Sequence, residues 1–291
     1  MTVIKTESPA KINLTLEVIR RRSDGFHELR TVMIKLFNLK DQLEFNIKPG
    51  VRKITVSCDN PDVPLDEKNI CYKAVEIFLD KLGEDLEISI KINKKIPIEA
   101  GLGGGSSNAG STFLVLNEYF KYPFSKGQLI EMASEAGKDV PFFFSKKDGA
   151  LVEGAGEKVG ESFDFEAGCF LVVNPGVEIS TKEAFKKISA KIQRMRDGDR
   201  TNVSERMLEF IKNNSEERIA SCFYNDFEEM AEKMYPIIKE IKQVLSVLGA
   251  RGSLMSGSGS TVFGWFGDQE EAKKARKIIK NKYKDFLVEI G

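Results

Sequence analysis

The sequence predicts an α+β protein with two domains. Strand-like and helix-like segments are mixed in both halves of the chain and no segment repeats, which indicates α+β architecture. The 291 residues are enough for two domains of about 100–200 residues each. Gly154, Gly156 and Gly160 cluster near the middle of the chain and indicate a boundary within 150–167. We therefore expect one domain at 1–155 and a second at 156–291.

Strands dominate the first 60 residues. Short segments rich in Ile, Val, Leu and Thr are separated by the turn-like sequences Ser23-Asp24-Gly25 and Lys48-Pro49-Gly50, which favours antiparallel pairing. The expected strands are Val3–Ser8, Thr15–Ile19, Thr31–Leu36, Gln42–Ile47 and Lys53–Cys58.

Helical and strand periods alternate over the next 80 residues. These patterns predict a helix over Asp66–Leu82, which ends at Gly83, and a half-buried strand over Leu86–Ile92. A helix over Ser106–Tyr119 follows. The capping box Ser125-Lys126-Gly127-Gln128 then predicts the start of another helix, which ends near Gly137.

The second half of the chain predicts a further set of short strands and helices. The strands are Cys169–Val173, Ser253–Ser256, Thr261–Phe266 and Phe286–Ile290. The helices are Thr181–Ile188, Val203–Lys212, Ile219–Lys233, Pro236–Leu248 and Asp268–Tyr283. The polar stretch at 191–202 predicts a mobile loop.

Charge and composition exclude several classes of protein. The 44 basic and 44 acidic residues give zero formal net charge, which argues against a general nucleic-acid binder. The longest uncharged apolar runs, such as Cys169–Val173, span five residues, whereas a membrane helix needs about 20. Residues 1–7 lack the layout of a signal peptide, so we expect a cytoplasmic enzyme with no membrane attachment.

The rare residues narrow the chemistry further. The four cysteines, at 58, 71, 169 and 222, form no Cys-x-x-Cys pair, so we expect free, buried thiols rather than a zinc site or a dithiol. His27 is the one histidine of the chain. Zincin motifs need at least two histidines, and a Ser-His-Asp triad needs one in a defined setting. Catalysis must therefore rest mainly on Lys, Asp, Ser and backbone groups.

The most informative segment is Ile96-Pro97-Ile98-Glu99-Ala100-Gly101-Leu102-Gly103-Gly104-Gly105-Ser106-Ser107-Asn108-Ala109, with four glycines in five positions between a strand and a helix. Glycine allows positive φ and leaves no Cβ, so successive N–H groups can converge on an anion, helped by the helix start and by seryl hydroxyls. A Walker A or Rossmann loop does not fit, because Ser106 stands where lysine or the third glycine is required. The segment predicts a polyphosphate cradle at the surface, where substitution costs little stability. A flexible connector is the alternative.

Three further segments carry candidate residues. Met255-Ser256-Gly257-Ser258-Gly259-Ser260-Thr261 is either a tight turn or a ligand loop that faces the first loop across a cleft. Lys11 and Asn13 should project side by side from one strand face, and because Asn is a poor strand former, a function is favoured over a surface position. Asp139, which an apolar run follows, is either a solvated turn residue or a general base.

These segments, in this order, resemble the GHMP kinase superfamily, which is named after galactokinase, homoserine kinase, mevalonate kinase and phosphomevalonate kinase. The segments are Pro-Ala-Lys-Ile-Asn-Leu at 9–14, Pro-x3-Gly-Leu-Gly-Gly-Gly-Ser-Ser-Asn-Ala at 97–109, Gly-x-Asp-Val-Pro-Phe-Phe at 137–143 and Ser-Gly-Ser-Gly-Ser at 256–260. Asp24-Gly25-Phe26-His27-Glu28-Leu29 narrows the resemblance to the branch that acts on a cytidine diphosphate substrate. Lys138 and Glu99-Ala100 depart from the family pattern, in which small residues and a more glycine-rich start are common.

The resemblance implies an N-terminal ribosomal-protein-like domain and a C-terminal ferredoxin-like α/β-plait domain, with the active site in the cleft between them. It implies a small-molecule kinase that uses ATP to phosphorylate the 2-hydroxyl of 4-diphosphocytidyl-2-C-methyl-D-erythritol in the non-mevalonate isoprenoid pathway. ATP and Mg2+ are the expected cofactors. The expected partner is this small-molecule substrate, with no nucleic acid, membrane or obligate protein partner.

The same resemblance implies roles for individual residues. Asp139 would accept the proton of the 2-hydroxyl, and Lys11 would keep Asp139 ionised and offset charge on the transferring group. Ser107 is the candidate contact to magnesium. The implied ATP-binding residues are Pro97, Gly101, Leu102, Gly103, Gly104, Gly105, Ser106 and Ser107. The implied substrate-binding residues are Asn13, Phe26, His27, Thr181 and Phe185, with Phe185 stacked on the cytosine.

Other functions remain open at this point. A kinase for mevalonate, homoserine or a sugar conflicts with the Asp24–His27 segment, and a catalytically idle nucleotide-binding protein conflicts with the intact Lys11 and Asp139. An RNA-binding module conflicts with the neutral charge. His27 is alternatively a turn residue that caps the hairpin at Ser23-Asp24-Gly25.

Overall fold

The computed structural model describes residues 1–192 and 202–291. Most of the predicted loop at 191–202 therefore lies outside the described residues. The chain divides by its contacts into two compact units. Unit 1 comprises Met1–Ala10, Leu39–Ile98 and Gly103–Lys146, and unit 2 comprises Lys11–Asn38, Glu99–Leu102 and Lys147–Gly291. The expected division of the sequence at residue 155 stays a prediction.

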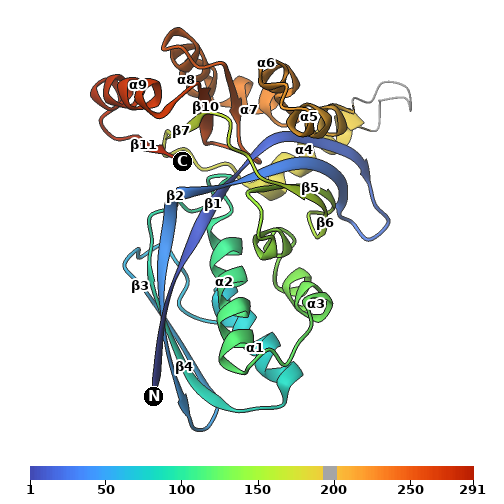
Figure 1. The fold of residues 1–291 in the computed structure, drawn as a ribbon, viewed down its shortest axis with the longest axis vertical. Coiled ribbons are helices and arrows are strands. Elements are labelled where there is room, and N and C mark those ends of the chain that lie inside the picture. The colour runs from blue at the N-terminus through green and yellow to red at the C-terminus, as the bar shows by residue number, and fades with distance from the viewer. Residues whose placement is uncertain (193–201) are drawn as a thin grey trace. The chain divides into compact units, whose positions relative to one another are not determined.

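Two long strands contribute to both units. β1 (Thr2–Arg21) and β2 (His27–Pro49) are neighbours in one sheet (Figure 1) and are joined by the predicted turn at Ser23-Asp24-Gly25. Four short strands were expected here, and the chain forms two long ones instead. Poor strand formers such as Asn13 are compensated by side-chain hydrogen bonds, so pairing continues through them.

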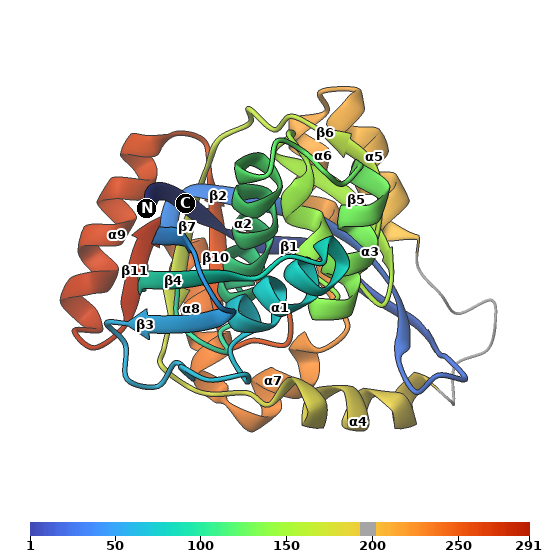
Figure 2. The same cartoon turned by 90° about the horizontal axis from the view of Figure 1, so that it is seen from below.

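Unit 1 packs helices on one face of a sheet. β4 (Leu86–Asn93) pairs in parallel with β3 (Lys53–Cys58) and antiparallel with the second half of β2. Helices α1 (Ile70–Leu82) and α2 (Gly104–Tyr119) cover this sheet (Figure 2). Helix α3 (Lys126–Ala136) packs against both of them, and the 3-10 helix η1 (Val140–Phe144) follows α3. The antiparallel pairing predicted for β3 is wrong, because β4 separates it from β2.

Local sequence signals set the helix ends of unit 1. Asn69 Oδ1 accepts a hydrogen bond from Cys71 N–H at 2.8 Å and caps α1, which ends at Gly83 with a φ of 74°. The predicted capping box of α3 is present, because Ser125 and Gln128 bond each other's backbone N–H groups. These caps orient the helices over a core of alternating strand residues, as the half-buried pattern of β4 predicts.

The first sheet continues in unit 2 with three short strands. β5 (Gly149–Gly154) pairs antiparallel with the first half of β2, β6 (Lys158–Phe163) pairs with β5, and β8 (Tyr224–Asn225) pairs in parallel with β1. Gly154 and Gly156, which indicated a domain boundary, are turn residues of the β5–β6 hairpin, with φ of 75° and 119°. The glycine content of this segment hid both strands from the sequence analysis.

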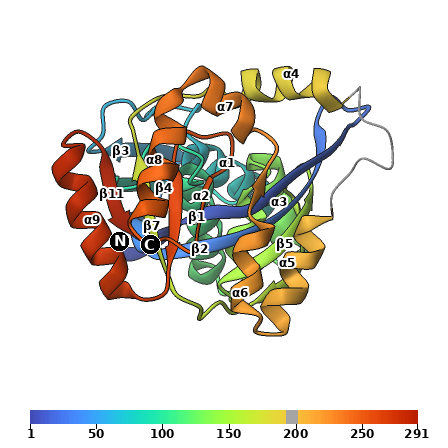
Figure 3. The same cartoon turned by 90° about the horizontal axis from the view of Figure 1, so that it is seen from above.

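A second, four-stranded sheet lies in unit 2. Its order is β11 (Leu287–Ile290), β7 (Cys169–Asn174), β10 (Val262–Phe266) and β9 (Gly252–Met255), all antiparallel. Helices α8 (Pro236–Val247) and α9 (Gln269–Lys282) pack against it (Figure 3). Every residue of β10 is buried, including Trp265. All these elements match the predicted ones to within two residues.

The remaining elements of unit 2 contain the clearest departure from the sequence expectations. They are α4 (Thr181–Ile192), α5 (Val203–Lys212), α6 (Glu216–Ile219), the 3-10 helix η2 (Ala220–Cys222) and α7 (Glu228–Met234). The predicted helix over Ile219–Lys233 is wrong, because β8 interrupts it. Asn225 Oδ1 accepts from Phe227 N–H at 2.9 Å and Asp226 Oδ2 accepts from Val18 N–H at 2.8 Å, so these side chains compete with helical bonding.

Two general expectations are decided by the described residues. None of the helices described in 1–192 and 202–291 is both long and apolar enough to cross a membrane. All four cysteines are free, but only Cys71 and Cys222 are buried, whereas Cys58 and Cys169 are half-buried at strand ends. The expectation of four buried thiols is therefore wrong for two of them.

Candidate active site

Lys11 and Asn13 lie side by side on β1, as predicted. The Lys11 ammonium donates to Asn13 Oδ1 at 2.7 Å, and the two residues are 4% and 1% exposed. An ammonium taken out of water needs hydrogen-bond acceptors or negative charge around it. Lys11 is therefore a buried cation on an ordered strand, which distinguishes it from a surface lysine.

The Asn13 side chain is held at both ends. Its Oδ1 accepts from Lys11, and its Nδ2 donates to Thr31 Oγ1 at 2.8 Å, while Thr31 bonds the Thr15 carbonyl. The Asn13 backbone N–H donates to Ser256 Oγ at 3.3 Å. This network orients Asn13 toward Lys11. A substrate contact by Asn13 stays a prediction, and it would use the one remaining lone pair or the remaining amide hydrogen.

The two glycine-rich loops meet in unit 2. Ser256 Oγ donates to Gly101 O at 2.9 Å, and Lys11 N–H donates to Leu102 O at 2.9 Å. Gly101 has a φ of 77°, and a Cβ at this position would lie 2.1 Å from Ser256 O. The backbones therefore touch where a side chain cannot fit. This is direct packing of the second loop on Gly101, which shows that the second loop is more than an isolated turn.

The second part of the first loop opens helix α2 in unit 1. Gly103 is the N-cap, with a φ of 66°, and α2 begins at Gly104 rather than at the predicted Ser106. No side chain caps this end, and the first turn contains no acidic residue. The first N–H groups of α2 therefore keep their capacity to bind an anion, with the positive end of the helix dipole behind them.

Gly104 is needed for packing, since its φ is not positive. A Cβ on Gly104 would lie 2.8 Å from Lys94 Nζ and 2.9 Å from Ile96 Cγ2. Gly104 is buried, as is Leu102, which is 1% exposed. The expectation that the loop lies at the surface and tolerates substitution is wrong at these positions, because the start of α2 packs on the segment that follows β4.

A buried ion pair, which no pattern in the sequence predicts, supports this helix start. The Lys94 ammonium donates to Asp41 Oδ2 at 2.7 Å and to Ile96 O at 2.6 Å. Asp41 Oδ1 accepts from the N–H groups of Lys95 and Ile96 at 2.7 and 2.9 Å. The carboxylate is fully buried, and it therefore fixes the backbone that precedes Pro97. Asp41 follows a strand-like run with no motif around it, so the sequence carried no signal for it.

Two polar atoms of α2 are candidates for contact with a ligand. Ser107 Oγ and Asn108 Oδ1 are buried and have no hydrogen-bond partner among the described residues. A buried hydroxyl without a partner is costly unless a ligand or water satisfies it. The residues therefore fit the approach of a phosphate or a phosphate-bound cation. In residues 1–192 and 202–291, no cluster of three or more His, Cys, Asp or Glu side chains could hold a metal by itself.

Asp139 lies between α3 and η1 in unit 1. It is half-buried, and the residues that follow it, Val140 and Phe142, are fully buried. The neighbouring Lys138 ammonium donates to Ser134 O at 3.3 Å, on the last turn of α3, where a positive charge is favourable. The family departure at Lys138 is thus accommodated by the helix end. That Asp139 acts beside Lys11 stays a prediction.

His27 belongs to an aromatic stack in unit 2. Its ring stacks on Phe185 with centroids 4.9 Å apart, and Phe185 meets Phe227 edge-on at 4.8 Å. Burial, and after it the charge of Arg21, lowers the pKa of the His27 imidazole below its ordinary 6.5. Asp24 Oδ1 accepts from Phe26 N–H and caps the hairpin turn, which weakens the alternative that His27 has this role.

Two other predicted substrate residues flank the stacked rings in the sequence: Phe26 precedes His27, and Thr181 opens α4, the helix that carries Phe185. Phe26 is 48% exposed at the turn, and Thr181 Oγ1 shares a hydrogen bond with Ser258 Oγ at 2.8 Å. Thr181 is thus tied to the second glycine-rich loop, near the start of α4. Unit 2 therefore connects Lys11, Asn13, Gly101 and the Ser256 loop in one network, and it stacks His27 on Phe185.

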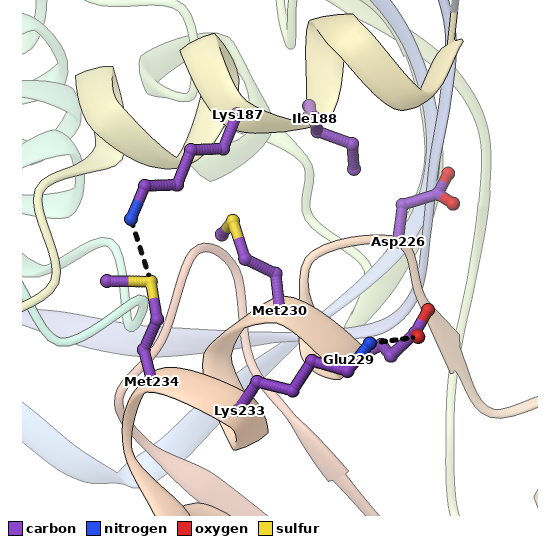
Figure 4. A pocket seen from close by; sticks show the side chains of 7 residues that line it. All are labelled: Lys187, Ile188, Asp226, Glu229, Met230, Lys233 and Met234. Atoms are coloured by element: carbon purple, nitrogen blue, oxygen red, sulfur yellow. Dashed lines mark hydrogen bonds and ion pairs between the residues drawn. The ribbon is translucent and has the colours of Figure 1, made fainter. Parts of the chain in front are cut away.

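A pocket of about 380 Å³ lies between α4 and α7 (Figure 4). Its lining is Lys187, Ile188, Asp226, Glu229, Met230, Lys233 and Met234. Figure 4 shows the thioethers of Met230 and Met234 inside it and the Lys233–Glu229 ion pair, at 2.7 Å, on its rim. None of the predicted site residues lines this pocket, and we assign it no part in the reaction.

Known families match both halves of the chain. Residues 69–147 match the GHMP kinases N terminal domain, and residues 207–285 match the GHMP kinases C terminal domain. A 4-diphosphocytidyl-2-C-methyl-D-erythritol kinase of Syntrophus aciditrophicus is 38% identical over 277 residues, which cover 95% of this chain and 95% of the relative. The kinase of the same name from Desulfotalea psychrophila is 38% identical over 282 residues, with coverage of 96% and 91%.

Solved structures resemble the chain over nearly its whole length. A crystal structure of 4-(cytidine 5'-diphospho)-2C-methyl-D-erythritol kinase has a TM-score of 0.78 and 29% identity, and the match covers 99% of this chain and 98% of the other. A homoserine kinase from Cytophaga hutchinsonii has a TM-score of 0.76 at 18% identity, with coverage of 100% and 94%. The second likeness shows a shared fold alone.

Proposed function

Since this chain belongs to the 4-diphosphocytidyl-2-C-methyl-D-erythritol kinases, a branch of the GHMP kinases, we propose that it transfers the γ-phosphoryl group of ATP to the 2-hydroxyl of 4-diphosphocytidyl-2-C-methyl-D-erythritol. The chain is a small-molecule kinase, and ATP is its phosphoryl donor. The observation that carries the proposal is full-length identity of 38% to kinases of that name.

The phosphates of ATP bind at the start of α2. The uncapped N–H groups after Gly103 and the helix dipole oppose the charge of the polyphosphate. Gly101 and Gly103 supply the positive φ angles that let the backbone turn around the phosphates, and Pro97 begins this segment. Ser107 Oγ, which is buried and has no hydrogen-bond partner in residues 1–192 and 202–291, supports a contact to the phosphates or to their magnesium ion.

Asp139 and Lys11 carry the chemistry. Asp139 takes the proton of the substrate 2-hydroxyl as that oxygen attacks the γ-phosphorus. The Lys11 ammonium, oriented by Asn13, holds positive charge beside the transferring group and keeps the base ionised. Phosphoryl transfer depends mainly on positioning and on electrostatic stabilisation, so these groups suffice without a histidine base.

Magnesium, bound with ATP, would neutralise charge on the β- and γ-phosphates. The donor set around α2 is hydroxyl and amide oxygen, which suits a hard cation, and Ser107 is the residue assigned to it. The stack of His27 and Phe185 is assigned to the cytidine end, where Phe185 offers an aromatic face. Phe26 and Thr181 are assigned to the same end by their places next to His27 and on α4.

A coupled ADP-release assay on a substrate panel tests the proposal. We expect saturable turnover with 4-diphosphocytidyl-2-C-methyl-D-erythritol, and only background ADP release with mevalonate, homoserine or galactose under the same conditions. Equal or faster turnover of one of the other alcohols would overturn the proposed substrate. Because ADP release from all four is measured with the same coupling enzymes, the panel contains its own control for uncoupled ATP hydrolysis.

A further inference from the structure

We propose that Asn225 is a positioning residue, which holds the Ser256 loop and the aromatic stack of Phe227, Phe185 and His27 in register with Lys11. The inference rests on the proposed function, in which Lys11 and this stack serve opposite ends of the same substrate. Asn225 itself contacts backbone groups in the structure, so its effect passes through the segments that it binds.

The Asn225 side chain is bound to three backbone groups. It is 6% exposed, and its Nδ2 donates to Met255 O at 2.7 Å and to Gly257 O at 2.8 Å. Its Oδ1 accepts from Phe227 N–H at 2.9 Å. Both amide hydrogens are therefore used, and no other side chain of this size offers two adjacent donors and an acceptor in one plane. The residue joins two segments that are 28 or more positions apart in the sequence.

On one side, Asn225 fixes the loop that carries Ser256. Its two acceptors, Met255 O and Gly257 O, flank Ser256 directly. Ser256 Oγ donates to Gly101 O and accepts from Asn13 N–H, and Asn13 accepts from the Lys11 ammonium. A continuous line of bonded groups therefore runs from Asn225 to Lys11.

On the other side, Asn225 fixes the base of the aromatic stack. Phe227 is 1% exposed, and its N–H is the group that Asn225 holds. Its ring supports Phe185 at 4.8 Å, and Phe185 stacks on His27 at 4.9 Å. A shift at Phe227 is therefore passed on to the stack, because each ring rests on the one before it.

Asn225 lies on a short strand that pairs with β1, so the Ser256 loop and the aromatic stack are both tied to β1 through it. β8 pairs in parallel with β1, and Leu16 is opposite Asn225. Asp226 N–H donates to Leu16 O at 3.0 Å. The residue is thus anchored to the strand that carries Lys11 and Asn13, and the loop and the stack are aligned to that strand through one side chain.

The substitution Asn225→Ala tests the proposal. It removes all three side-chain bonds, and because misplacement of reacting groups by about 1 Å costs about 100-fold in rate, we expect kcat/KM for the cytidine substrate to fall by about that factor. Both parameters should change, kcat through the Lys11 side and KM through the stack. Asn117→Ala is the matched control, since Asn117 is 5% exposed and also binds a backbone N–H and carbonyl, both of Phe124, but in unit 1.

A second readout does not depend on the substrate. The imidazole signals of His27, the one histidine of the chain, report on the stack in the free protein by NMR. We expect Asn225→Ala to move these signals and Asn117→Ala to leave them in place, although both variants lose stability. A folded Asn225→Ala variant that keeps more than about a third of wild-type kcat/KM, or whose His27 signals are unmoved, overturns the proposal.

The isosteric substitution Asn225→Asp decides the matter if Asn225→Ala is unfolded at the assay temperature. It keeps an oxygen that accepts from Phe227 N–H. It also places a carboxylate oxygen next to the carbonyl oxygens of Met255 and Gly257, where Asn225 has its two N–H donors. Protonation of the new carboxyl restores one donor, so the ratio of variant to wild-type kcat/KM should rise as the pH falls. A flat ratio overturns the proposal. If the wild type itself fails to turn over the cytidine substrate, the proposed function fails, while the His27 signals still decide the role of Asn225.

Discussion

Gly101→Ala is the substitution whose cost follows most directly from the structure. Gly101 has a φ of 77°, and the added Cβ would lie 2.1 Å from Ser256 O and 2.9 Å from Ser256 C. A left-handed backbone costs a non-glycine residue about 1–2 kcal/mol. Forcing two backbones apart in a packed region costs about 1–3 kcal/mol more. We therefore expect the free energy of unfolding of the protein to fall by about 2–5 kcal/mol.

The fluorescence of Trp265 measures this loss. It is the one tryptophan of the chain, it lies in unit 2, and it is fully buried, so its emission follows the unfolding of that unit in urea. Gly105→Ala is the control, because its Cβ would meet Ile70 Cγ2 at an ordinary 3.5 Å and its φ is not positive. If Gly101→Ala unfolds within about 0.5 kcal/mol of the wild type, as surface substitutions do, the two loops are not packed as described.

The remaining predictions concern catalysis, the helix start and pH. Asp139→Asn should keep nucleotide binding and lower kcat by about 10²–10⁴-fold in steady-state kinetics. A variant that keeps more than about a tenth of the wild-type kcat would refute the role of Asp139 as the base. If Asp139 and Lys11 act as a unit, kcat of the double variant with Lys11→Ala should be barely lower than that of either single variant. Gly104→Val should raise the KM for ATP and, because of its contact with Lys94, also lower the melting temperature, so an unchanged KM would remove Gly104 from the phosphate site. Folding lowers the pKa of the His27 imidazole, so the unfolded state binds more protons at this residue than the folded state does. The free energy of unfolding should therefore decrease as the pH falls below 6.5. His27→Gln should make this decrease smaller in urea titrations at several pH values, and an unchanged pH dependence would contradict the assignment.

Local patterns predicted the elements whose signals are contained within the element. Strict alternation gave β4, and the capping box gave the start of α3, because both depend on neighbouring residues only. The side-by-side placement of Lys11 and Asn13 follows equally from the two-residue period of a strand, and the 2.7 Å bond between them confirms it.

Long-range pairing explains what the sequence analysis missed. The helix predicted over Ile219–Lys233 is split because Asn225 and Asp226 bond groups on distant segments, which local periodicity does not report. β5 and β6 were not predicted, because the glycines in this segment resemble a linker but form the turn of a hairpin. The order β3-β4-β2 depends on which strands pair, and no local signal separates parallel from antiparallel partners.

The candidate site shows the same division. The glycines of the first loop were expected to allow positive φ or to leave bare backbone, and Gly101 and Gly103 do have positive φ, at 77° and 66°. The structural reason for a glycine at position 104 could not be predicted, because the Lys94 and Ile96 side chains that crowd this position come from the segment before the loop. Asp41 carries no motif in the sequence, and its role became visible only through its bonds to Lys94 and Ile96.

31P NMR of the product formed from ATP and 4-diphosphocytidyl-2-C-methyl-D-erythritol tests the proposed reaction most directly. We predict ADP and one new phosphomonoester signal, with the phosphorus attached through the 2-hydroxyl oxygen. We also predict that Asp139→Asn forms the same product much more slowly. A product phosphorylated at another hydroxyl, or release of inorganic phosphate without a new ester, would contradict it.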